Sequence, residues 1–208
     1  MKNCPSCGAP VTFVSAQSLV AVCGYCRTTL LRRDLDVEQI GVMGALLEDA
    51  TPLQLGAEGV WRSVHFAVVG RLQVRWEQGG WNEWYCVFDD GRAGWLGEAA
   101  GEYSLSFEAT VSEPLPNWKG LEPGQAVTLG GVRYEVTDVR EAEVVAGEGE
   151  LPCRVGSGWT TRSADLRNET ARVATLDYTD EAPRVYLGEA VEVAALRLRG
   201  LREFEGWR

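Results

Sequence analysis

The stretches Cys4-Pro5-Ser6-Cys7-Gly8 and Cys23-Gly24-Tyr25-Cys26 decide the N-terminal fold, because each carries a Cys-x-x-Cys knuckle. Two short β-prone runs at residues 11–14 and 19–22 lie between them and predict a hairpin that brings the knuckles together. Four thiolates at this spacing suit a tetrahedral ion and leave no position for a catalytic water. We therefore expect a zinc ribbon over residues 1–33, with a structural Zn²⁺ cofactor held by Cys4, Cys7, Cys23 and Cys26.

Two other interpretations of the four cysteines stay open. A redox dithiol needs one Cys-x-x-Cys beside a strand-helix-strand unit, and the sequence around these pairs does not predict one. An iron centre of the rubredoxin kind uses the same four-thiolate geometry as zinc, so only metal analysis separates the two. Cys86 and Cys153 are distant from both knuckles in the sequence, and we expect them to be core or free thiols.

Residues 34–52 follow a different period. Val37, Ile40, Met43 and Leu47 are three or four positions apart, which is the spacing of one helix face. Gly41 weakens this pattern, because glycine lowers helix propensity. We predict a short helix or linker over residues 34–52.

From Pro52 onward the residue pattern of the sequence is typical of a β protein. Short runs of Val, Thr, Tyr, Phe and Trp alternate with turn sequences such as Asp89-Asp90-Gly91 and Gly130-Gly131. Long helical stretches do not separate these runs. The pattern predicts a mainly β fold, either an antiparallel sandwich or tandem small β-barrel-like units.

The body of the chain also repeats itself. Leu55-Gly56 has a counterpart in Pro123-Gly124, and an aromatic-Leu-Gly-Glu-Ala word occurs at residues 95–99 and again at 186–190. We predict a first β unit over residues 53–115 and a second over 116–208. The two copies differ in length, so we expect an insertion in the second copy at residues 147–158. Within it, residues 147–152 predict an exposed acidic loop.

Five aromatic residues fall within twenty positions and alternate with acidic and amide residues. One interpretation is that the alternating rings pack a small β core. The other is a surface where tryptophan faces and carboxylates receive a cation, such as an organic amine. For the second interpretation the candidate binding residues are Trp81, Asn82, Glu83, Trp84 and Trp95.

Charge is distributed unevenly along the chain. The net charge is −10, yet the first 33 residues hold four basic and no acidic residues, which leaves −14 on the rest. So acidic a body repels phosphate backbones, and nucleic-acid binding through the ribbon alone is not expected to be strong. No apolar run approaches the roughly 20 residues that span a bilayer, and no signal peptide precedes the first cysteine. We expect a cytoplasmic protein without membrane insertion.

The sequence offers little for catalysis. His65 is the only histidine and sits in a strand-like run, and neither a Gly-x-Ser-x-Gly elbow nor a phosphate-cradling glycine loop is present. Paired carboxylates remain open, because 30 acidic residues allow many pairs. We expect no enzymatic activity.

The motifs Trp81-Asn82-Glu83-Trp84 and Gly149-Glu150-Leu151-Pro152 resemble those of a bacterial family of domains of unknown function that often follows a zinc-ribbon knuckle pair. This resemblance covers nearly the whole chain. It implies a non-enzymatic regulatory or scaffold role, since such genes often neighbour those of polyamine-synthesis enzymes and membrane-stress proteins. It implies no catalytic residues.

Three functions remain as hypotheses. The first is an adapter, in which the ribbon and the β body each bind a protein partner. The second is a receptor for a small organic cation, such as a polyamine, at the aromatic and acidic cluster. The third is weak nucleic-acid contact through the basic ribbon.

Overall fold

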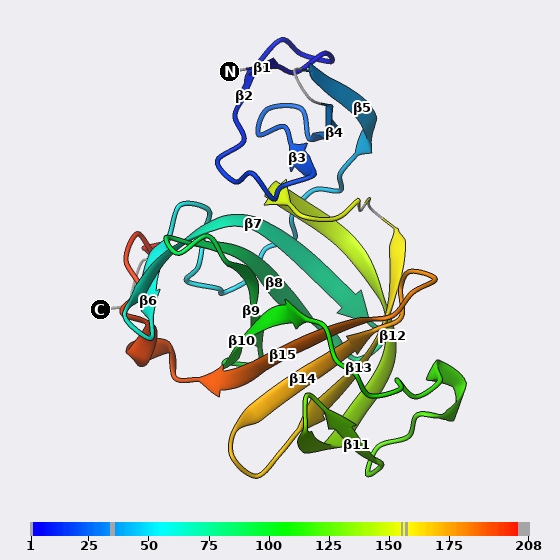
Figure 1. Cartoon of the computed structure of the whole chain (residues 1–208). Coiled ribbons are helices and arrows are strands. Elements are labelled where there is room, and N and C mark those ends of the chain that lie inside the picture. The colour runs from blue at the N-terminus through cyan, green and yellow to red at the C-terminus, as the bar shows by residue number, and fades with distance from the viewer. Residues whose placement is uncertain (1, 34–35, 155, 157, 204–208) are drawn as a thin grey trace.

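The structure is a computed structural model that describes residues 2–33, 36–154, 156 and 158–203. These residues form fifteen β-strands and two short 3-10 helices, η1 (Trp118–Gly120) and η2 (Val193–Leu196) (Figure 1). The prediction of a mainly β fold is confirmed. No helix in this described part is long and apolar enough to cross a membrane.

Eight strands close into an antiparallel barrel (Figure 1). In ring order they are β7 (Val64–Trp76), β8 (Gly79–Phe88), β9 (Ala93–Ala99), β10 (Glu102–Ala109), β15 (Arg184–Val191), β14 (Arg172–Asp177), β13 (Trp159–Arg167) and β12 (Val132–Leu151). The ring closes where β12 pairs with β7, for example Gly147 with Leu72. A closed ring leaves no free edge within the barrel itself.

Two tandem units build this barrel. In the first unit β6 (Glu58–Trp61) forms a hairpin with β7, and in the second β11 (Ala126–Leu129) forms one with β12. The Gly56 N–H donates to the Val68 carbonyl at 2.9 Å, and the Gly124 N–H donates to the Val136 carbonyl at 2.8 Å. The segments at Gly56 and Gly124 thus make the same backbone contact beside their hairpins.

The matching five-residue words at residues 95–99 and 186–190 do not mark equivalent strands. The first word lies in β9, the fourth strand of its unit, and the second lies in β15, the fifth strand of its unit. The two words instead flank β10, which pairs with both strands. Their similarity is therefore not evidence for the repeat.

Each unit has its own apolar cluster on the outer face of the barrel. The first contains Leu53, Phe66, Trp84, Leu96, Leu105 and Leu196 among others. The second contains Leu121, Leu129, Tyr134, Leu166, Leu176 and Val185 among others. The segments before β6 and after β15 contribute to the first cluster, and β11 and the segment before it to the second. The barrel wall is thus packed from outside.

An insertion in the second unit closes the ring. β7 ends at Trp76, whereas β12 continues past the equivalent position, Val144, to Leu151. The prediction of extra residues in this region is confirmed, but the prediction of an exposed loop over residues 147–152 is wrong up to Leu151. These residues continue β12, which pairs there with β7 and with β3 (Val20–Val22), and Glu150 is buried.

The ribbon extends the barrel sheet. It consists of β1 (Lys2–Asn3), β2 (Pro10–Val11), β3 (Val20–Val22), β4 (Thr28–Arg33) and β5 (Asp36–Val42). β3 pairs with the end of β12, so the blue N-terminal strands sit beside β12 and β7 (Figure 1). One apolar cluster joins the two parts: it takes Val20, Val22, Leu31 and Met43 from the N-terminal segment and Leu72, Val74, Ala142, Val144 and Leu151 from the barrel.

The prediction of a helix at residues 34–52 is wrong. Residues 36–42 form β5, which pairs with β4, residues 34 and 35 lie outside the described residues, and residues 43–54 have no regular structure. The free edge of β4 supplies a backbone partner that the local apolar spacing could not reveal. Only Val37 and Met43 of the apparent helix face are buried, while Ile40 and Leu47 are exposed.

Candidate functional site

The four predicted cysteine ligands come together at the tip of the ribbon. All four Sγ atoms lie within 4.8 Å of one another. Cys4 and Cys26 are 3.6 Å apart and Cys7 and Cys23 are 3.7 Å apart, measured between Sγ atoms. Zinc–sulfur bonds of about 2.3 Å in a tetrahedron place the sulfurs about 3.8 Å apart, so the donor set and its spacing fit a tetrathiolate ion.

The two knuckles have the same backbone. The Gly8 N–H donates to the Cys4 carbonyl at 2.8 Å, and the Arg27 N–H donates to the Cys23 carbonyl at the same distance. Gly8 and Arg27 both have positive φ, 76° and 59°. The position equivalent to Gly8 in the second knuckle is therefore Arg27.

The pKa values of two of the four thiols are shifted in opposite directions. Hydrogen bonds from the Thr28 hydroxyl and backbone N–H lower the pKa of Cys26 to about 6. At Cys7 the Ala9 N–H favours the thiolate, but hydrogen bonds with the neighbouring cysteines, Cys26 foremost, help to outweigh it and the pKa is raised to about 12. Crowded sulfurs compete for charge in this way when no cation compensates them, and a divalent ion supplies that compensation.

The barrel encloses a second candidate site, a cavity of about 1240 Å³. All eight barrel strands contribute to its lining, and its central walls include Trp81, Glu83, Trp95, Asp165, Asp177 and Tyr186. Strand alternation selects these residues, because successive side chains point to opposite faces of the wall. An eight-stranded barrel can hold one small ligand in its interior.

Two aspartates in the cavity act on Glu83. Burial, together with the negative charges of Asp177 and Asp165, raises the pKa of Glu83 to about 7 against the hydrogen bond from Trp81. Burial also raises the pKa of Asp165, against a hydrogen bond from the Thr175 hydroxyl at 2.9 Å. The Trp81 indole N–H donates to Glu83 Oε1 at 2.9 Å. The cavity therefore favours bound positive charge.

Four arginines line the cavity, and among the described residues three of them form ion pairs: Arg140, Arg167 and Arg184. Arg140 pairs with Asp138 at 2.6 Å, and its guanidinium carbon lies 3.8 Å from the centre of the Trp76 ring. Arg184 forms an ion pair with Asp180. The lining holds about twice as many carboxylates as arginines, so its net charge is negative.

Cys153 and Cys86 are separate from the four-cysteine cluster. Cys153 lines the cavity, and burial raises the pKa of its thiol to about 12. Cys86 is fully buried in the apolar cluster of the first unit. All six cysteines of the chain are free of disulfides.

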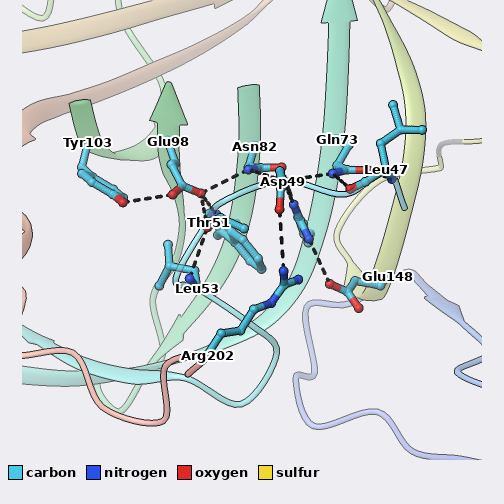
Figure 2. A network of polar contacts seen from close by, with 12 residues as sticks. Leu47, Asp49, Thr51, Leu53, Gln73, Asn82, Glu98, Tyr103, Glu148 and Arg202 are labelled. Carbon is cyan, nitrogen blue, oxygen red and sulfur yellow. Dashed lines mark hydrogen bonds and ion pairs between the residues drawn. The ribbon is translucent and has the colours of Figure 1, made fainter. Parts of the chain in front are cut away.

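Of the five predicted binding residues, the structure brings three into the cavity and two to the opposite face of β8. Trp81, Glu83 and Trp95 line the cavity. Asn82 instead donates a hydrogen bond to Glu98 Oε2 at 3.2 Å (Figure 2). Trp84 donates one to the same oxygen at 2.9 Å. For Asn82 and Trp84 the prediction is wrong, because the pleat turns alternate residues to opposite faces.

The outer network contains a buried arginine. Arg71 forms an ion pair with Asp49, donates two hydrogen bonds to Asn82 Oδ1, and stacks on Trp84 at 4.6 Å from the ring centre. Asp49 Oδ2 also accepts a hydrogen bond from Gln73 at 3.0 Å (Figure 2). These contacts tie the irregular segment after β5 to the barrel wall, which is a structural role.

Sequence reasoning did not identify Asp165, Asp177 and Tyr186 as site residues. The available signal is alternation: Ser163, Asp165 and Arg167 in β13 take turns with the buried Ala164 and Leu166. Alternation separates the two faces of β13, but it does not show that the polar face points into the barrel.

Comparison with known proteins places the barrel in a family. The family described as "Domain of unknown function (DUF4178)" matches residues 54–193, a range that contains all eight barrel strands and excludes the ribbon. Searches of curated proteins and of solved structures gave no match to this chain.

Proposed function

This chain belongs to the DUF4178 family of domains of unknown function, and we propose that its barrel is a receptor for a small organic cation. The observation that supports this proposal is the cavity, where Glu83 lies beside Trp81 and Trp95 without an arginine or lysine partner among the described residues. A cation over a tryptophan face gains about 0.5–2 kcal/mol, more when water is excluded. An adjacent carboxylate adds a charge-assisted hydrogen bond.

Calorimetry tests the receptor proposal. Spermidine titrated into the metal-loaded protein should release heat with one binding site per chain, because an amine compensates Glu83. Glu83→Gln keeps an acceptor for Trp81 but removes the charge, so we expect affinity to fall at least about tenfold. Glu122→Gln changes an exposed carboxylate outside the cavity and serves as the control. Absence of heat at millimolar concentrations of spermidine and simpler amines would remove the proposal.

We further propose that the four cysteines hold a structural Zn²⁺. The closed set of four thiolates supports this assignment, since structural zinc sites use all four positions for protein ligands. Elemental analysis of the purified protein should give one zinc per chain. Stoichiometric iron, with the visible absorption of an iron–thiolate centre, would replace zinc in this assignment.

Exposed apolar residues on the ribbon support a second function, that of an adapter for a protein partner. Tyr25 and Val14 are 79% and 76% exposed, and Leu19, Ile40 and Val42 are also exposed. Apolar side chains gathered on one module are typical of a protein-binding surface. A partner that co-elutes with the wild type should be lost in the Cys4→Ser, Cys7→Ser double variant and weakened in Tyr25→Ser, which keeps the metal ligands. Retention by Tyr25→Ser would exclude this surface.

A further inference from the structure

We propose that the cavity takes a linear dication, with one positive group at Glu83 and the other at Asp165 and Asp177. This inference rests on the proposed receptor function and adds the number of charges on the ligand and their positions. It is carried by where these carboxylates lie on the barrel wall and by which of their neighbours are already paired.

The carboxylates lie on opposite walls of the cavity. Glu83 is on β8 and Asp177 is on β14, and in the ring of eight strands these two strands are separated by three others in each direction. Asp165 pairs with Thr175 across β13 and β14, so Asp177 is its diagonal neighbour, about 7–8 Å away. One positive group can therefore serve Asp165 and Asp177 together, and a second is needed at Glu83.

The positive side chains near these carboxylates are shared with other partners. Arg184 lies opposite Asp177 in the β14–β15 pair and acts on it, but its ion pair is with Asp180. Arg140 acts on Asp165, forms its ion pair with Asp138, and lies over the rings of Trp76 and Trp81. Within the described residues no ion pair includes Glu83, Asp165 or Asp177. These arginines balance only part of the carboxylates in the lining, so a monocation at one wall leaves excess negative charge at the other, whereas a dication compensates both.

The space between the two walls suits an apolar spacer. Trp81 and Trp95 stand beside Glu83 and pack against the central apolar cluster. On the far wall Tyr186 pairs with Thr175, next to the two aspartates. Rings at both ends of the path favour methylene groups between the two cations, because apolar surface is buried there.

The experiment compares two ligand series that differ in one charge. Calorimetry on the metal-loaded protein uses α,ω-diaminoalkanes of increasing length and ω-amino alcohols of the same lengths, in which a hydroxyl replaces one amine. The best diamine should bind at least about tenfold more tightly than its amino alcohol, since a charge-assisted bond is gained. Affinity should pass through a maximum with length, where the two ammonium groups span the walls.

Two variants locate the charges. Glu83→Gln and the double variant Asp165→Asn, Asp177→Asn keep the hydrogen-bond acceptors of the native side chains. Both variants should weaken the diamine at least about tenfold and abolish most of its advantage over the amino alcohol. Glu122→Gln should leave both series unchanged.

Each outcome decides a different claim. Equal affinities for diamine and amino alcohol in the wild type would overturn the dication proposal while the receptor function stands. No binding of either series would overturn both. If the double variant does not fold, the comparison of the two series on the wild type still decides the number of charges.

Discussion

At the scale of single residues, the knuckle backbone and the cavity carboxylates are the features that decide behaviour. Gly8 and Arg27 occupy the same left-handed position in the two knuckles, but only glycine adopts it without strain. Glu83 carries a carboxyl group whose protonation depends on the fold around it. Substitutions at these positions are therefore expected to change the unfolding free energy in different directions. Backbone strain sets the direction in the knuckles, and the burial of a charge sets it in the cavity.

Gly8→Ala should destabilise the metal-loaded protein by about 1 kcal/mol, because alanine at φ 76° is strained. Arg27→Gly should be neutral or stabilise it by up to about 1 kcal/mol, since it relieves the same strain in the second knuckle. Thermal unfolding with excess zinc measures both effects. Gly24→Ala is the matched control, since a Cβ there has open space. A Gly8→Ala protein as stable as the wild type would contradict the assignment of strain.

Stability should depend on pH through Glu83. Its pKa is raised in the folded protein from 4.5 to about 7, so the folded state holds this proton more strongly than the unfolded state. The unfolding free energy should therefore fall as the pH rises from about 4.5 to 7 and level off above. Glu83→Gln removes this dependence, and its unfolding free energy should exceed that of the wild type by about 3 kcal/mol at pH 8. Urea unfolding at pH 5 and pH 8 measures the change, and a pH-independent difference between the two proteins would contradict it.

Single residues were predicted well where chemistry fixes their spacing. The four cysteines follow from the knuckle motif alone, because one ion needs four thiolates within a few ångströms. The cavity residues follow only in part. Trp81, Glu83 and Trp95 stood out as aromatic and acidic neighbours, but which face of β8 each residue takes depends on the barrel, as Asn82 shows.

At the scale of elements, β12 determines how the molecule is joined. It belongs to the second unit, closes the ring against β7, and receives β3 of the ribbon. Its end is tied to the ribbon again where buried Glu150 accepts the Ser15 N–H at 3.1 Å. One strand thus holds three parts of the fold together.

The seam between β7 and β12 requires a glycine at position 70. A Cβ on Gly70 would lie 1.8 Å from the Glu150 carbonyl oxygen, closer than atoms can approach. Gly70→Ala should therefore push the strands apart and destabilise the protein by about 3 kcal/mol. Gly41→Ala in β5 is the control, because nothing lies within 4 Å of its Cβ position. Denaturant unfolding compares the two variants, and equal stability would show that the seam adapts without cost.

Elements were predictable where the partner strand is local. The turns of the β8–β9 and β11–β12 hairpins follow from Asp89-Asp90-Gly91 and Gly130-Gly131, since the paired strands are neighbours in the sequence. β5 and the end of β12 could not be predicted, because their partner strands are set by tertiary structure. Apolar spacing at residues 37–47 and the glycines near residue 149 resembled a helix and a loop when considered without those partners.

At the scale of the whole molecule, the ribbon and the barrel share one apolar cluster and one sheet. The sequence predicts two tandem β units but gives no sign of the ring in which the eight strands join. Its closing pairs, such as Gly70 with Gly149, link residues far apart in the chain whose side chains carry no pairing signal.

Removal of the metal should therefore also lower the thermal stability of the barrel. Chelation takes away the ion that orders the ribbon, and Val20, Val22 and Leu31 then lose their fixed places in the shared cluster. All eight tryptophans lie outside residues 1–33, so tryptophan fluorescence reports the body alone. We expect its melting temperature to fall by at least about 5 °C, which corresponds to about 2 kcal/mol for a chain of this size. Readdition of zinc is the control, and an unchanged melting temperature would show that the two parts are independent.

The pairing of β3 with β12 also sets an order of events during synthesis. Residues 20–22 leave the ribosome roughly 130 residues before their partners at 149–151. At about 5–20 residues per second, that delay is on the order of ten seconds. A nascent chain that captures its ion early would keep those hydrophobic N-terminal residues organised during the wait, so intracellular zinc supply would influence the yield of folded protein.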